Sequence, residues 1–183
     1  MLFMFTSSNE QPSTSQVVSF LWVALLFTGV LSIDRFFEKE RAQGTLELIS
    51  ILPLRKSAFY LAKCLLSLLY ICLPLGVFCI VSFFVWEIPI IQAIPSLLLG
   101  ALGLSALSAL FGPFPLSKQS PKILLPLLVF PLAIPLVLVG TWATFYALEK
   151  NPSSFFWHNL LWIIDVIYIL IGVFLFRPLC ATR

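Results

Sequence analysis

Charged side chains are scarce in this chain. Asp, Glu, Lys and Arg make up only 10% of its 183 residues, whereas soluble domains carry roughly 25%. Hydrophobic residues make up 60% of the chain, and the mean hydropathy is +1.05. A soluble domain of this size has no way to bury so much apolar surface, so we expect a lipid bilayer to be its solvent. The net charge of +3 gives no indication of nucleic acid as a partner.

The motifs of common enzymes and metal sites are also missing. No GxxxxGK[ST] loop occurs, which excludes ATP hydrolysis by a P-loop. The single histidine, His158, excludes a multi-histidine metal site, and no Ser-His-Asp or Cys-His arrangement is visible. The cysteines form no CxxC pair, and three of the four lie in one apolar run, where cysteine usually behaves as a small hydrophobe; they are Cys64, Cys72, Cys79 and Cys180. We therefore expect a chain that is not an enzyme and holds no metal.

Long apolar runs are what the chain does have. About 20 residues cross a bilayer, and a spanning segment must satisfy its own backbone as a helix or a closed barrel. The runs are continuous rather than alternating, which excludes a barrel. The sequence thus predicts an all-α, polytopic membrane helix bundle, a single domain over residues 1–183. Its five full spans are Val17–Ile33, Ala58–Trp86, Ala93–Leu116, Ile123–Leu148 and Leu160–Phe176, with short connections at Glu87–Gln92, Ser117–Lys122 and Glu149–Asn159.

The placement of positive charge predicts the orientation, because cytoplasmic loops carry an excess of Lys and Arg. If segment 34–57 is cytoplasmic, ten of the eleven Lys and Arg residues lie on that side. Only Lys150 lies on the opposite side. The C-terminus is then cytoplasmic and the N-terminus, residues 1–16, is an external tail. Met1–Phe5 does not resemble a signal peptide, because no basic region precedes it and no cleavage site follows a long apolar core.

Segment Ile33–Lys56 concentrates the charge of the chain, with five of its eleven Lys and Arg residues and four of its eight acids. We expect the first span to continue into it as an amphipathic helix that Gly44 ends. Thr45 is a natural N-cap for a second short helix, in which Glu47 complements the helix dipole, and Pro53 closes it. Two interpretations remain open: a solvated loop that only sets topology, and a docking site for a soluble partner.

Several intramembrane residues are candidates for function. Pro131 and Pro135, with Pro126, predict a broken or curved fourth span. Asp165 lies in the last span, by our count about a turn and a half below the outer surface; a structural or water-exposed role and a role in permease movement or substrate passage are both open. His158, in the expected loop FFWHN, is either an exposed loop histidine or a haem ligand. Aromatic residues near helix ends, Trp22 among them, are typical of interfacial belts.

The string EKERAQGTLELISILPLRKSAFYLAK resembles the cytoplasmic coupling segment of ABC-2-type permeases. Together with WVALLFTGVLSIDRFFEKERAQGTLELISILPL and LLPLLVFPLAIPLVLV, it is similar to the CcmB family. The resemblance runs from about Val18 onward. It implies an ABC-2-like permease whose coupling segment binds a separate ATPase. Carried onto this sequence, the ATPase-coupling residues are Glu38, Glu40, Arg41, Gly44, Thr45, Leu46 and Glu47.

The resemblance also implies a role and a setting. CcmB proteins are permease subunits of haem export and delivery in cytochrome c biogenesis, in the bacterial inner membrane. Their partners are a CcmA-like ATPase and CcmC-, CcmD- and CcmE-like proteins, and haem is the transported or handled ligand. The alternatives are an ABC-2-type permease for lipid, polysaccharide or drug, and a truncated remnant. The family has six spans, so Met1–Phe5 looks like the tail of a first span, and we expect a truncated chain or a misassigned start codon.

Overall fold

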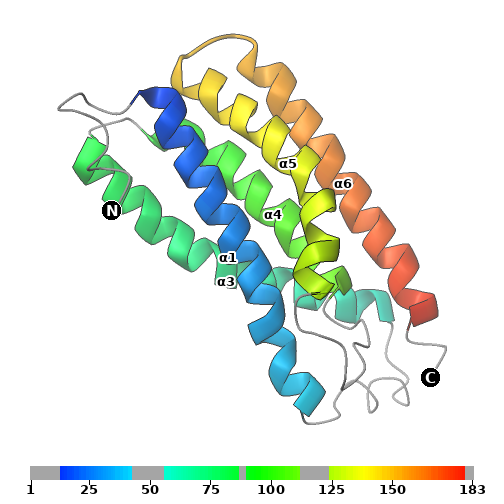
Figure 1. Cartoon of the computed structure of the whole chain (residues 1–183). Helices are drawn as coiled ribbons and strands as arrows, with labels where there is room; N and C mark the ends of the chain where they lie inside the picture. The colour runs from blue at the N-terminus through cyan, green and yellow to red at the C-terminus, as the bar shows by residue number, and fades with distance from the viewer. Residues whose placement is uncertain (1–12, 43–55, 87–89, 112–123, 180–183) are drawn as a thin grey trace.

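The computed structural model describes residues 13–42, 56–86, 90–111 and 124–179. In this part of the chain five long helices form an up-and-down bundle (Figure 1). They are α1 (Thr14–Ala42), α3 (Lys56–Trp86), α4 (Ile94–Phe111), α5 (Leu124–Leu148) and α6 (Ser154–Leu179), and a short 3-10 helix, η2 (Ile90–Ala93), precedes α4. All five are long and apolar enough to cross a membrane. The predicted class, a multi-pass all-α membrane bundle, is confirmed.

Helix α4 lies at the centre and packs against each of the other four long helices. Thirteen of its 18 residues are buried. The sequence ALGLSALSAL explains this position, because glycine, alanine and serine let neighbouring backbones approach closely when lipid gives helices no hydrophobic reason to associate. The core of the bundle therefore lies along a helix whose small residues admit close neighbours and whose leucines are buried beside them.

Trp22 of α1 fixes the contact between α1, α4 and α5. Its indole N–H donates to Thr144 Oγ1 on α5 at 2.9 Å, and that oxygen lies 2.8 Å from Ser96 Oγ on α4. A Cβ added at Gly100 or Gly140 would lie 2.3 or 1.9 Å from the indole ring, so only glycine leaves room for it. Trp22 is fully buried, and its assignment to an interfacial belt was wrong: a hydrogen-bond partner inside the bundle satisfies the polar atom that would otherwise hold it at the interface.

A second polar contact joins α3 to α4. Tyr60, Cys64 and Ser67 follow one face of α3 at helical spacing. The Tyr60 hydroxyl donates to the Ala106 carbonyl at 3.1 Å, and Cys64 Sγ lies 3.2 Å from Ser105 Oγ. Ser67 hydrogen-bonds to Ser108 in the same row. These three interactions add to the apolar packing of Ile71 and Leu75, which α3 also contributes to the core.

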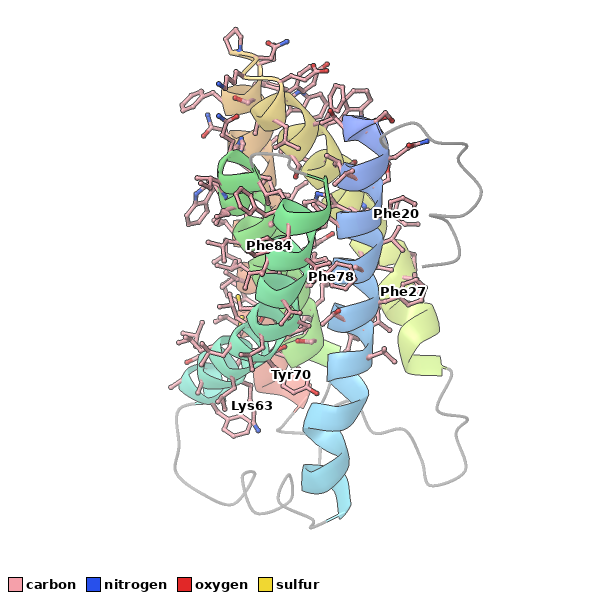
Figure 2. All side chains as sticks on the ribbon, turned by 90° about the vertical axis from the view of Figure 1, so that its left-hand side faces the viewer. Phe20, Phe27, Lys63, Tyr70, Phe78 and Phe84 are labelled. Carbon is pink, nitrogen blue, oxygen red and sulfur yellow. The ribbon has the colours of Figure 1, made fainter. Side chains whose placement is uncertain are left out.

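The outer faces of the bundle carry large apolar side chains. Figure 2 shows those on α1 and α3, among which Phe20, Phe27, Phe78 and Phe84 are exposed. In water such a surface would drive aggregation, whereas in a bilayer it faces lipid. Lys63 carries its ammonium 5.5 Å from the centre of the Phe59 ring.

Helix α6 differs from the expectation, and helix α5 takes the curved rather than the broken form of the two that were expected. Helix α6 begins at Ser154, so most of the expected loop Glu149–Asn159 is helical. The turn before it is short because Lys150 has a positive φ of 54° and the Ser154 amide donates to the Asn151 carbonyl. Helix α5 is not broken: it runs through Pro131 and Pro135, and Figure 1 shows its axis turning between its two halves.

The glycines around Trp22 give the first testable prediction. Replacing Gly140 or Gly100 with alanine places a methyl group 1.9 or 2.3 Å from atoms of the indole ring, where the two overlap. Overpacking of this kind costs about 1–3 kcal/mol. We expect both variants to be less stable than the wild type by about this amount in reversible unfolding from lipid–detergent micelles. The control is Gly76→Ala on α3, where an added Cβ meets nothing within 4 Å. Equal stability of all three variants would contradict the packing around Trp22.

Candidate functional site

The helical part of the charged segment continues α1 beyond the membrane span. The span ends at Leu31 and the helix continues eleven residues further, to Ala42, which is about 16 Å at 1.5 Å per residue. Figure 1 shows this end of α1 extending past the other helices. The prediction that the first span continues as a helix is confirmed through Glu38, Glu40 and Arg41. The other expected coupling residues, Gly44, Thr45, Leu46 and Glu47, lie outside the described residues.

Asp165 lies deeper than the sequence suggested. Because α6 begins at Ser154, Asp165 comes eleven residues after the start of the span and ten before its end at Leu175. It is therefore about 15–16 Å from either end of this span at 1.5 Å per residue, near the middle of the span. Our count of a turn and a half was wrong because it began at Leu160. The side chain is fully buried.

Three helices surround the Asp165 carboxyl group. On α4 it lies against Gly103, where an added Cβ would be 2.4 Å from Asp165 Oδ1 and 2.5 Å from Leu136 Cδ1 of α5. Cys64 of α3 is close enough to interact with it electrostatically. Neither carboxyl oxygen has a hydrogen-bond partner among the described residues. A buried polar group without a partner costs free energy, so this site differs from the satisfied hydroxyl contacts elsewhere in the bundle.

The segment Pro131–Pro135 of α5 contacts α6 close to Asp165. Pro131 and Pro135 themselves are exposed on the outer side of the bundle. Between them, the Leu132 carbonyl accepts a hydrogen bond of 2.5 Å from the Tyr168 hydroxyl on α6, and Tyr168 lies one turn after Asp165. The structure thus brings the Asp165 and Pro131–Pro135 candidates to neighbouring positions on the α5–α6 contact, although they are 30 or more residues apart in the chain.

His158 is on a helix rather than in a loop. It lies in the second turn of α6, and its Nδ1 is 2.7 Å from the Ser154 carbonyl. A carbonyl oxygen only accepts, so Nδ1 carries the proton and the lone pair of the neutral ring is on Nε2. The neighbouring Trp157 stacks on Trp142 and Tyr146 of α5, with ring centres 6.0 and 6.2 Å apart. This aromatic stack packs α5 against α6 near the turn that joins the two helices.

No sequence pattern indicated which residues these side chains contact. Gly103 is one of several small residues in α4, and no sequence pattern indicated that it lies opposite Asp165. Trp22 and Thr144 are 122 residues apart, and no local pattern connects them. Two signals did exist: a lone acid in an apolar run, and a glycine at a position where a neighbouring helix must come close.

The family model for the CcmB protein matches residues 3–178. The chain belongs to the CcmB family. It is 31% identical over 147 residues to a protein of Pseudomonas aeruginosa named heme exporter protein B, and 32% identical over 123 residues to one of the same name in Paracoccus denitrificans. These alignments cover 78% and 66% of this chain. No solved structure is significantly similar to it.

This CcmB chain matches only part of each relative. The alignments span 64% of the Pseudomonas protein and 56% of the Paracoccus protein. The family match covers all five long helices to within one residue of the end of α6. The match also includes residues 34–57, the segment expected to bind the ATPase.

The hydrogen bond between α5 and α6 gives the second prediction. Tyr168→Phe removes the donor to the Leu132 carbonyl, and hydrogen bonds between membrane helices contribute about 0.6 kcal/mol on average. We expect the free energy of unfolding in mixed micelles to fall by about that amount. Tyr146→Phe is the control, because the Tyr146 hydroxyl makes no hydrogen bond within the described residues and its ring keeps its stacking. A fall of the same size in the control would contradict the assignment.

Proposed function

We propose that this chain is the permease subunit of an ABC transporter for haem export and delivery in cytochrome c biogenesis. The family match over residues 3–178 carries the proposal, and two relatives named heme exporter protein B support the substrate. The subunit is not catalytic: with no P-loop in its sequence, it draws energy from a separate, CcmA-like ATPase. CcmC-, CcmD- and CcmE-like proteins are its further partners in the bacterial inner membrane.

The ATPase binds at the coupling residues that begin on α1, which we assign as Glu38, Glu40, Arg41, Gly44, Thr45, Leu46 and Glu47. With this segment cytoplasmic, as the Lys and Arg distribution favours, the C-terminus is cytoplasmic too. Helix α1 supports the assignment, because one continuous helix links this end to Trp22 in the bundle core. A displacement of the protruding end is transmitted along the helix to the packing around Trp22, since a helix with unbroken hydrogen bonds moves as one rigid element.

Charge reversal in the coupling segment gives the third prediction. Glu47→Lys places a positive charge where the ATPase meets a negative one, and we expect the ATPase recovered with the purified chain to fall about tenfold, equivalent to about 1.4 kcal/mol of binding free energy. The control is Glu149→Lys, the same change at an exposed acid directly after the C-terminal end of α5. It should leave ATPase recovery unchanged. Unchanged recovery with Glu47→Lys, or an equal loss in both variants, would contradict the docking site.

The substrate is tested separately. We expect the wild-type chain, produced in a bacterium that lacks its own CcmB, to restore covalent haem staining of c-type cytochromes. The Glu47→Lys variant should restore much less, because it uncouples the ATPase. Binding of the ATPase without restoration of staining would point to an ABC-2-type permease for another substrate. Failure of both would favour a non-functional remnant.

A further inference from the structure

Asp165 is the one buried charge-bearing side chain that the structure describes, and its carboxyl group packs closely against a neighbouring helix. Gly103 on α4 faces it directly, and the Leu136 side chain of α5 covers the same spot. A side chain of any size at position 103 would fill the space that the carboxyl group occupies. The close approach of α4 and α6 and the presence of an acid there are therefore parts of one arrangement.

No basic group neutralises this acid within the described residues. Helix α6 packs against α3, α4 and α5. Helix α4 has no ionisable side chain, and the described side chains of α5 include only Tyr146, at its far end. On α3 the groups that face inward are Tyr60, which donates to the Ala106 carbonyl, and Cys64, which pairs with Ser105. The remaining titratable side chains of α3 with a described environment are not buried; they are Lys63, Tyr70, Cys72 and Cys79. On α6 itself, Tyr168 donates to Leu132.

The close packing around the Asp165 carboxyl group determines which cation the group can bind. Both carboxyl oxygens are shielded and neither has a hydrogen-bond partner in the part of the chain that the structure describes, so an ionised carboxylate here would keep its full desolvation cost. A metal ion requires several oxygen ligands and the space to hold them, whereas the adjoining atoms belong to a glycine and a leucine. A proton requires neither.

We propose that Asp165 is a proton-binding site that the contact between α4 and α6 closes. While Gly103 lies against it, the carboxyl group keeps its proton. When α4 and α6 separate, water enters between them, accepts the proton from the carboxyl oxygen and solvates the carboxylate that remains. Separation of the two helices is thereby linked to proton release, and their return to proton uptake. The inference concerns this chain alone and holds whatever its substrate is.

Infrared spectroscopy tests the protonation state directly. The full chain in lipid nanodiscs is compared with Asp165→Asn, and the difference spectrum isolates the carbonyl stretch of a neutral carboxylic acid at position 165. We expect this band in the wild type at neutral pH and its loss in the variant. Absence of any band that depends on Asp165 at neutral pH would overturn the proposal, because the acid would then be ionised in the closed bundle.

A pair of glycine variants tests the link to helix packing and keeps Asp165 in place, so the test does not depend on how well Asp165→Asn folds. Gly103→Ala forces α4 away from the carboxyl group, while Gly76→Ala on α3 adds a methyl group in open space. We expect the carboxylic acid band to disappear at a pH at least one unit lower in Gly103→Ala than in wild type, and at the wild-type pH in Gly76→Ala. Identical titrations in the two variants would show that the α4–α6 contact does not control the proton.

Discussion

The structure depends on how closely four helices approach α4. Each approach uses a residue of α4 with almost no side chain: Gly100 beneath Trp22 of α1, Gly103 beneath both Asp165 of α6 and Leu136 of α5, and the alanine and serine positions that receive α3. Dispersion contacts and hydrogen bonds, the main attractions between helices in lipid, both fall off steeply with distance. A thicker central helix would have weakened all four contacts at once. The glycines are thus the condition for the polar contacts, since hydroxyl and indole groups reach their partners only when the backbones are this near.

The bundle also divides its polar groups by role. The tryptophan, threonine, serine, tyrosine and cysteine contacts are satisfied in pairs and hold α1, α3, α4 and α5 together. Among the described residues, Ser82 and Gln92 each have one buried side-chain oxygen without a partner, and Asp165 has two. Asp165 lies on α6, whose span is the least buried of the five. The acid with unpaired oxygens therefore lies on a helix that packs against α3, α4 and α5 while most of its surface faces outward.

The spans were predictable because the length of an apolar run is a local property. Each of the five expected spans coincides with a long helix of the structure, and the helical continuation of the first span through Arg41 agrees as well. The start of α6 was missed because His158 and Asn159 made a helical turn look like a loop, and the wrong depth of Asp165 followed from that start. The partners of Trp22, Asp165 and Tyr168 were not predictable, because they depend on the rotation and register of helices far apart in sequence. Helix α4, buried on almost every side, has no polar face from which its rotation could be inferred.

The enclosure of Trp22 has a further consequence. Of the tryptophans whose side chains are described, it alone is fully shielded from the surroundings, while Trp142 and Trp162 are about half exposed. Indole emission depends on the polarity around the ring, and this ring donates a hydrogen bond to a fixed hydroxyl on another helix. The chain therefore contains a native optical reporter at the junction of α1, α4 and α5. A movement that begins at the charged end of α1 would shift the wavelength of the Trp22 fluorescence emission, with no label added.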